Sequence, residues 1–224
     1  MDKFYTLPKV TKTCVEAVGD LSGFECIIEP SAGSGSFLRR LKQLHPNVVG
    51  YDIDPPVEDG IIKQDFLKLT TLPTDRNILV IGNPPFGRQA SMAVKFFNHS
   101  AGFPQVVCIT MIFPKSFKKT SVQNRLSLDF TLFQSLDLPD KAFHLPNGVF
   151  KEVPCVFQIW KRIEPPRQRI TPQALDSAEF DFVSSPFSPL TIALRRVGHY
   201  AGKAQPYTTF ESLSDRMSKP RGDG

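Results

Sequence analysis

Residues 24–36 read FECIIEPSAGSGS, and this stretch decides the fold. Residues 24–29 form a short, largely apolar run that stops at Pro30, and Gly33 and Gly35 follow shortly after. Apolar residues then recur at helical spacing, at Phe37, Leu38, Leu41 and Leu44. The stretch therefore predicts a strand, a glycine loop and a helix, in that order.

The same alternation continues along the chain. Apolar runs at residues 48–53, 61–66, 77–82 and 106–112 predict four more strands, and residues 92–97 predict a helix. Strands that are apolar on both faces and alternate with helices are typical of a parallel sheet covered on both sides. Shorter runs at residues 132–138, 148–150 and 154–160 favour an antiparallel hairpin at one edge. The predicted fold class is doubly wound α/β, with a mostly parallel, Rossmann-like sheet and an antiparallel edge hairpin.

The composition of the chain changes near residue 163. Residues 1–163 carry the pattern of strands and helices and are predicted to form one domain. Residues 164–189 are rich in Pro, Ser and Gln, so we expect a linker or a wrapping arm there. Residues 190–197 can form one more strand, and the polar residues 212–224 are expected to fray. The second predicted region is therefore residues 164–224.

Composition argues against several classes of protein. With 41% hydrophobic and 22% charged residues, the 224-residue chain has an ordinary soluble composition. Its longest apolar run, residues 106–113, is far shorter than the roughly 20 residues of a membrane helix, and the N-terminal residues lack an apolar signal stretch. The cysteines stand far apart, at Cys14, Cys26, Cys108 and Cys155, and the histidines are not at metal-ligand spacing. We expect an intracellular protein, cytoplasmic or nuclear, with reduced cysteines and no metal site.

The glycine loop is a candidate ligand site. Such a loop exposes backbone N–H groups and lets a ligand approach closely, and its usual occupant is a nucleotide-like cofactor. The third glycine of the dinucleotide fingerprint is missing, because Leu38 stands at that position. Asp52 lies 19 residues after Gly33 at a predicted strand end, where an acidic side chain accepts hydrogen bonds from ribose hydroxyls. The alternative for Asp52 is a solvated carboxylate.

A second candidate site follows the predicted strand 77–82, at the edge where ligands bind in open parallel sheets. Here Pro84 and Pro85 fix the backbone, keep Asn83 extended and remove two N–H donors. The Asn83 side-chain oxygen and the Pro84 carbonyl can accept both hydrogens of a planar exocyclic amine, while Phe86 stacks on the ring that bears it. The alternative is a stiff surface loop with a buried Phe86.

Four motifs thus occur in order, at Glu29-Pro30-x-Ala32-Gly33-x-Gly35, residues 50–55, residues 64–67 and residues 82–87. Together they resemble the ordered motifs of the S-adenosylmethionine-dependent N6-adenine methyltransferases. Residues 4–8 are similar to the segment that precedes the glycine loop in the gamma-class arrangement of that family. The resemblance covers about residues 1–162. It implies a class I methyltransferase fold, S-adenosylmethionine as cofactor and methylation of an amine.

The resemblance also implies a role for each matching residue. Cofactor-binding roles fall on Tyr5, Thr6, Glu29, Pro30, Ala32, Gly33, Gly35, Asp52, Ile53, Asp65, Phe66 and Asn83. Catalytic roles fall on Asn83, Pro84, Pro85 and Phe86. Within the first set, Tyr5 and Thr6 belong to the methionine end of the cofactor and the glycine-loop residues to its amino-acid moiety. Asp52 belongs to the ribose, and Asp65 with Phe66 to the adenine amine and ring.

The implied reaction is direct methyl transfer to adenine N6 in nucleic acid, with RNA slightly ahead of DNA, on a base that is flipped out or unpaired. Only about 60 residues replace the large target-recognition domain of the DNA-modifying members, so RNA shape or a protein partner is expected to supply recognition. Guanine N2 in RNA and protein glutamine are alternative acceptors. A non-catalytic scaffold is the alternative of a different class.

The charge distribution bears on nucleic-acid binding. Residues 1–112 carry 11 basic and 11 acidic side chains, whereas residues 113–224 carry 16 and 11, which is the whole net charge of +5. The excess either aids solubility or neutralises a polyanion. Candidate contacts to the nucleic-acid backbone are Lys115, Lys118, Lys119, Arg195 and Arg196, with Phe117 as a stacking ring. The alternative is a solvated loop with Phe117 in the core.

Overall fold

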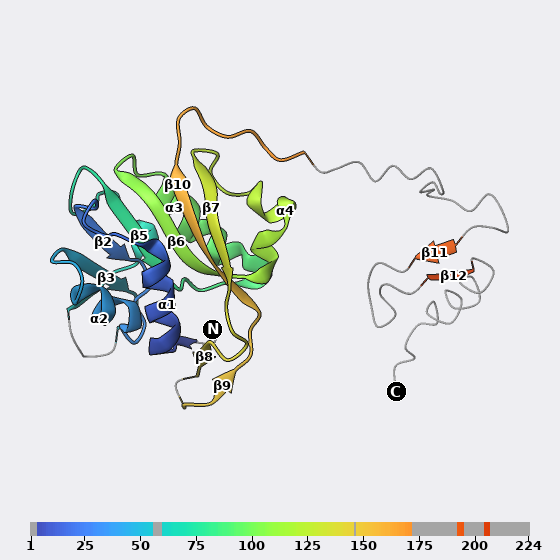
Figure 1. Cartoon of the computed structure of the whole chain (residues 1–224), viewed down its shortest axis with the longest axis horizontal. Coiled ribbons are helices and arrows are strands. Elements are labelled where there is room, and N and C mark those ends of the chain that lie inside the picture. Colours follow the sequence, from blue (N-terminus) through green and yellow to red (C-terminus); the bar gives the residue numbers. More distant parts are fainter. Residues whose placement is uncertain (1–3, 56–59, 146, 172–191, 195–203, 207–224) are drawn as a thin grey trace, which may run out of the picture. The chain divides into compact units, whose positions relative to one another are not determined.

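The computed structural model describes residues 4–55, 60–145, 147–171, 192–194 and 204–206. Seven strands form one sheet in the order β4-β3-β2-β5-β6-β10-β7 (Figure 1). Their bounds are Cys26–Glu29 (β2), Val48–Asp52 (β3), Ile61–Lys63 (β4), Ile78–Gly82 (β5), Val106–Pro114 (β6), Phe130–Asp137 (β7) and Cys155–Arg162 (β10). Strands β2 to β6 run parallel, and β10 pairs antiparallel with both β6 and β7. The predicted fold class, including the antiparallel edge hairpin, is confirmed.

The strand order reverses between β2 and β5. From β2 the chain adds β3 and β4 on one side, and it then crosses over to place β5 and β6 on the other. In open parallel sheets such a reversal opens a crevice at the carboxyl ends of the two central strands. The segments that follow β2 and β5 therefore meet at one edge, and these are the glycine loop and residues 83–86.

Both faces of the sheet are buried, because consecutive residues of a strand point to opposite sides. In β2, Ile27 belongs to one core cluster and Ile28 to the other. In β5, Leu79 and Val80 are divided in the same way. All residues of β2 and β5 are buried, which explains why these strands are apolar without alternation.

The helices are α1 (Pro8–Val18), α2 (Ser36–Lys42), α3 (Ser91–Ala101) and α4 (Thr120–Gln123), with 3-10 turns η1 (Phe66–Lys68), η2 (Arg88–Ala90) and η3 (Lys115–Lys118). Helices α1 and α2 supply one core cluster, through Val10, Cys14 and Phe37, and α3 supplies the other, through Phe97. Helix α1 is absent from the elements predicted above, although Pro8 at its first position is a helix start signal. Within the described ranges no helix is long and apolar enough to cross a membrane.

A smaller sheet joins the N-terminal residues to a late segment of the chain. Its strands are β1 (Tyr5–Thr6), β8 (Phe143–His144) and β9 (Phe150–Lys151), in the order β1-β8-β9. Strand β1 pairs antiparallel with β8, and Leu7 N donates to the Ala142 carbonyl at 3.0 Å. The pairing holds residues 5–7 against a hairpin that lies between β7 and β10 in the sequence.

The four cysteines are buried free thiols. Burial raises the pKa of Cys14, Cys108 and Cys155 to about 12. A thiol with so high a pKa stays protonated at neutral pH and is a poor nucleophile. These cysteines therefore contribute apolar packing rather than chemistry.

Contacts along the chain divide it into two units, Met1–Pro172 and Gln173–Gly224. In the second unit, β11 (Ile192–Leu194) pairs antiparallel with β12 (Ala204–Pro206). A strand is thus present within residues 190–197, as the sequence predicts, and its partner also belongs to the second unit.

Arg162 and Arg167 donate hydrogen bonds to backbone carbonyls near the end of the first unit. Arg162 Nε donates to the Val106 carbonyl at 2.7 Å. Beyond β10, Arg167 Nε donates to the Phe130 carbonyl at 2.7 Å, and its Nη2 donates to the Gln123 carbonyl at 2.8 Å. The boundary expected at residue 163 precedes the segment that Arg167 holds in place.

We expect Arg167→Ala to lower the free energy of unfolding of the full chain by about 1–3 kcal/mol, because backbone carbonyls lose a charged donor. Urea unfolding measures the change. Arg169→Ala is the matched control, since Arg169 is exposed and the described residues give it no hydrogen bond or ion pair. Equal stability of the two variants would contradict the anchoring role of Arg167.

Candidate functional site

The glycine loop and the residues after β5 are in direct contact at the carboxyl edge of the sheet. Ser31 Oγ in the loop donates to the backbone carbonyl of Asn83 at 3.1 Å. A Cβ built on Gly82 would lie 3.3 Å from Glu29 Cγ, so β2 and β5 approach closely where they end. The two segments that the sequence analysis singles out therefore form one site.

Backbone hydrogen bonds fix the glycine loop against β3. Ala32 N donates to the Tyr51 carbonyl at 2.9 Å, and Gly33 N donates to Asp52 Oδ2 at 2.8 Å. Gly33 and Gly35 have φ angles of +52° and +75°, in the left-handed region that favours glycine. The loop thus needs both glycines for its backbone conformation, and Gly35 is the residue before α2.

Asp52 lies where the sequence analysis expects it, at the end of β3 and beside the glycine loop. Its Oδ2 accepts from Gly33 N, and its Oδ1 accepts from Asp54 N at 2.9 Å. A carboxylate oxygen has two lone pairs, so each oxygen can accept one further hydrogen bond. The next residue, Ile53, is 68% exposed, which is high for a large apolar side chain. Asp52 therefore shapes the loop and can still bind hydroxyl groups.

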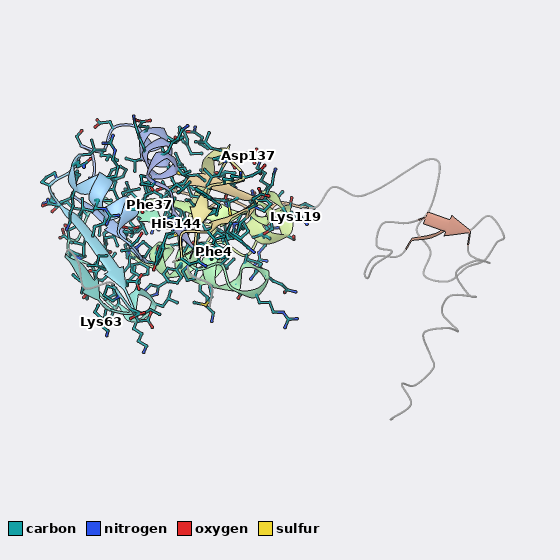
Figure 2. The ribbon with its side chains drawn as sticks, turned by 90° about the horizontal axis from the view of Figure 1, so that it is seen from below. Phe4, Phe37, Lys63, Lys119, Asp137 and His144 are labelled. Atoms are coloured by element: carbon teal, nitrogen blue, oxygen red, sulfur yellow. The ribbon has the colours of Figure 1, made fainter. Side chains whose placement is uncertain are left out.

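The N-terminal strand covers the glycine loop. A Cβ built on Gly33 would lie 3.4 Å from Cε1 of Tyr5. The Tyr5 ring also contacts His144 of β8, with ring centroids 5.6 Å apart, and Phe4 packs on Phe143 at 6.4 Å. Figure 2 labels Phe4 and His144 in this region. His144 is a site neighbour that sequence reasoning missed, because only the pairing of β1 with β8 brings it there.

Asn83 follows β5 directly, and its side-chain amide is held by the N-terminal strand. Nδ2 donates to Thr6 Oγ1 at 3.2 Å and lies 3.5 Å from the carbonyl oxygen of Phe4. The amide oxygen, Oδ1, is buried and has no hydrogen-bond partner among the described residues. The site therefore contains a fixed hydrogen-bond acceptor that no described residue of the protein satisfies.

Phe86 anchors the other end of this segment. Its half-buried side chain packs against both core clusters, and its carbonyl accepts from Met92 N at 3.0 Å at the start of α3. Gly87 follows with φ +69°, and a Cβ there would lie 2.7 Å from Met92 Cγ. Gln89 and Ala90 also have positive φ angles, of 51° and 59°. Strained backbone of this kind concentrates at functional sites.

Glu29 ends β2 as a buried carboxylate. It is 2% exposed, and its Oε2 has no hydrogen-bond partner within the described part of the chain. Burial raises the pKa of this carboxyl well above its ordinary value; the Leu38 N–H opposes the shift, Asp52 adds to it, and Arg39 opposes it. A cation or an N–H donor at Oε2 would satisfy the group.

Two other residues predicted to contact the cofactor, Asp65 and Phe66, have partners within the protein. Asp65 Oδ1 accepts from Leu67 N at 3.0 Å and caps η1. Phe66 is 1% exposed, and its ring stacks on Phe96 with centroids 5.9 Å apart. The expected contact of the Phe66 ring face with a cofactor therefore does not agree with the structure, because core packing occupies the ring.

In the basic stretch after β6, residues 115–119, the structure differs from the prediction at Phe117. Phe117 is fully buried and stacks on Phe113 at 4.0 Å, so its ring is unavailable to a nucleobase. The predicted stacking role of Phe117 is wrong, and the alternative placement in the core is correct. Lys115 and Lys118 are exposed and both reach Asp137, at 3.7 Å and 2.7 Å.

The remaining predicted basic contacts lie on the surface or outside the described residues. Lys119 is exposed and labelled at the periphery of the first unit in Figure 2. Arg195 and Arg196 lie outside the described residues. No group of three or more His, Cys, Asp or Glu in the described ranges is arranged to hold a metal ion.

Two surface hollows lie at the opposite, amino edge of the sheet. One is lined by residues 70–75 and 102–105, and the other by residues 19–22, 24–25 and 44–47. Neither contains a predicted site residue. We place the functional site at the carboxyl edge nonetheless, because Glu29 and Asn83, whose buried oxygens have no hydrogen-bond partner among the described residues, both lie at that edge, and the hollows lack such groups.

No protein-family model and no curated protein matches the chain. Among solved structures, the 23S rRNA methyltransferase ErmE has a TM-score of 0.53 and 16% sequence identity, covering 73% of this chain and 70% of its own. A candidate RNA methyltransferase from Pyrococcus horikoshii has a TM-score of 0.54 and 16% sequence identity, and the match covers 72% of this chain and 88% of that protein. A dimethyladenosine transferase from Plasmodium falciparum has a TM-score of 0.52 and 15% sequence identity, and the match covers 72% of this chain and 64% of that protein. The likeness establishes the class I methyltransferase fold of this chain.

The raised pKa of Glu29 predicts how stability depends on pH. A carboxyl whose pKa rises on folding holds its proton more tightly in the folded state. The free energy of unfolding therefore falls as pH rises from the unfolded pKa, about 4.3, toward the folded one. We expect Glu29→Gln to be more stable than the wild type at neutral pH and to lose less stability between about pH 5 and about pH 8.

Chemical unfolding of the ligand-free protein at both pH values measures this difference. Glu152→Gln is the matched control, because Glu152 is an exposed carboxylate outside the site. A Glu29→Gln protein with the pH dependence of the wild type would show that Glu29 does not titrate in this range.

Proposed function

We propose that this protein transfers a methyl group from S-adenosylmethionine to the N6 amine of an adenine in nucleic acid, with RNA favoured over DNA. The observation that carries the proposal is the buried Oδ1 of Asn83 at the carboxyl end of β5, which has no hydrogen-bond partner in the described part of the chain. A buried acceptor without a donor is unfavourable, so the site favours a ligand that brings an N–H group. The half-buried Phe86 next to it suits a planar base.

The residues around the glycine loop suit the cofactor. The free lone pairs of Asp52 can accept from two ribose hydroxyls, and the exposed Ile53 can contact an adenine face. The unpartnered Oε2 of Glu29 suits the ammonium group at the methionine end. Gly33 and Gly35 leave the loop backbone accessible. When bound, S-adenosylmethionine supplies a methyl group already activated by its sulfonium centre.

The chain's own residues then position the acceptor amine. An aryl amine is a poor nucleophile, because its lone pair is delocalised into the ring. Hydrogen bonds from its two protons to Asn83 Oδ1 and the Pro84 carbonyl favour a pyramidal nitrogen and stabilise the positive charge that develops on it. Phe86 stacks on the base and holds it in line with the methyl group. As the N–C bond forms, the S–C bond to the methyl group breaks and leaves a neutral thioether, and the positively charged nitrogen releases one proton to solvent. No covalent intermediate and no strong base are required.

Two features support nucleic acid as the substrate. Each of the three structural neighbours described above is named for methylation of RNA or of adenosine, and they share the fold of this chain. The basic excess of the chain lies in residues 113–224, and the exposed Lys115, Lys118 and Lys119 follow β6, the neighbour of β5 in the sheet. A polyanion that enters the site would meet these side chains.

Methyl transfer from labelled S-adenosylmethionine to RNA, single-stranded DNA, duplex DNA and protein, followed by nucleoside and amino-acid analysis, tests the proposal. We expect N6-methyladenine in RNA. Asn83→Ala should abolish turnover while leaving cofactor affinity in calorimetry nearly unchanged, because Asn83 binds the target amine. Asn47→Ala, at an exposed position before β3, is the control. A fully active Asn83→Ala protein, or methylguanine or methylglutamine as the product, would refute the assignment.

Salt dependence tests the nucleic-acid contacts. Each neutralised phosphate adds about 0.7 to 0.9 to the slope of log affinity against log salt concentration. Lys118→Ala combined with Lys119→Ala should therefore flatten the slope by roughly 1–2 and weaken all sequences about equally.

Binding of a fluorescent single-stranded RNA at several salt concentrations measures the slope. Lys9→Ala combined with Lys12→Ala is the control, since both lysines are exposed on α1. Wild-type binding that does not respond to salt would make the stretch after β6 an ordinary solvated surface.

A further inference from the structure

Thr6 contacts the amide that the proposed function places at the reaction centre. It is 4% exposed, and its Oγ1 accepts a hydrogen bond from Asn83 Nδ2 at 3.2 Å. Thr6 is held there by β1, where it is paired with Phe143 of β8. A buried hydroxyl at a fixed register position is thus directed at one atom of Asn83.

Neighbouring residues of β1 have different partners. Successive side chains of a strand point to opposite sides. Tyr5 lies against Gly33 of the glycine loop, whereas Thr6 contacts Asn83. The resemblance assigns both residues to the methionine end of the cofactor, but the contacts of Thr6 direct it toward the target amine instead.

The surroundings of Asn83 favour one of the two orientations of its amide. The carbonyl oxygen of Phe4 lies 3.5 Å from Nδ2, and a carbonyl can only accept hydrogen bonds. Rotation of the amide by half a turn would bring Oδ1 against this carbonyl and expose an N–H donor instead. In the observed orientation Thr6 and Phe4 accept from the nitrogen, and Oδ1 remains buried with no partner among the residues that the structure describes.

We propose that Thr6 is a positioning residue that, together with the Phe4 carbonyl, keeps the Asn83 oxygen facing the substrate amine and thereby selects amines as substrates. The Thr6 hydroxyl holds the amide in place, and the carbonyl, which can only accept, fixes which of its ends faces the substrate. With Oδ1 forward, the site binds an N–H donor such as adenine N6. With the amide reversed, it would offer a donor suited to a carbonyl oxygen, such as that of a keto base, and the amine would meet a like group. The inference rests on the proposed function for its substrate, while the orientation of the amide can be tested without turnover.

Nuclear magnetic resonance of the Asn83 side-chain amide tests the orientation. Loss of its N–H₂ signal in Asn83→Asp assigns the signal. We expect the signal of the wild-type protein to exchange with water more slowly than that of the exposed Asn147. In Thr6→Val, which removes the acceptor at nearly constant volume, the signal should shift and exchange faster, and Thr6→Ser should restore it. An Asn83 amide as fast as that of Asn147 in the wild type, or unaffected in Thr6→Val, would overturn the inference.

Kinetics separate this role from a cofactor contact. With an adenine-containing single-stranded RNA oligonucleotide, Thr6→Val should lower kcat by roughly 5- to 100-fold, with Thr6→Ser close to the wild type. Cofactor affinity in calorimetry and the melting temperature should change little. A Thr6→Val protein with weaker cofactor binding and unchanged kcat would place Thr6 at the cofactor and refute the positioning role. A wild type that methylates no substrate would refute the proposed function, and the resonance measurement would still decide the orientation.

Discussion

A parallel sheet that is buried on both faces has only its edges for polar chemistry. Ile27 and Ile28 of β2 point into opposite core clusters. The polar side chain of this strand that can bind a ligand is therefore that of Glu29, at its end. The same holds for β5, where Asn83 follows five buried residues. Because the strand order reverses between β2 and β5, both ends lie side by side at the carboxyl edge of the sheet, where ligands bind in folds of this kind. The position of the site follows from how the core is covered.

The fold was largely predictable because its signals are local. Apolar runs and the turn residues between them mark the strands of the parallel sheet, and Gly33 and Gly35 are required by their left-handed backbone. The pairing of β1 with β8 was not predictable, since strands of two residues have no periodicity and the pairing depends on distant parts of the chain. Helix α1 was missed although Pro8 marks its start.

The candidate site shows the same division between local and distant information. Asp52 and Asn83 were predicted as site residues from their places at strand ends, and the structure has both residues at those places. Phe66 and Phe117 stand in equally suggestive positions, yet both rings are buried against Phe96 and Phe113. Whether an aromatic side chain turns inward depends on which partner the tertiary structure supplies. The amide orientation of Asn83 is likewise set by residues far away in the chain.

Under the proposed function, the burial of Glu29 links the stability of the folded protein to the concentration of S-adenosylmethionine. Burial raises the pKa of the Glu29 carboxyl and disfavours its charged form. Its Oε2 has no hydrogen-bond partner among the described residues. Under the proposed function, the donor that answers it arrives with S-adenosylmethionine, so occupancy adds to folding stability in proportion to the logarithm of cofactor concentration.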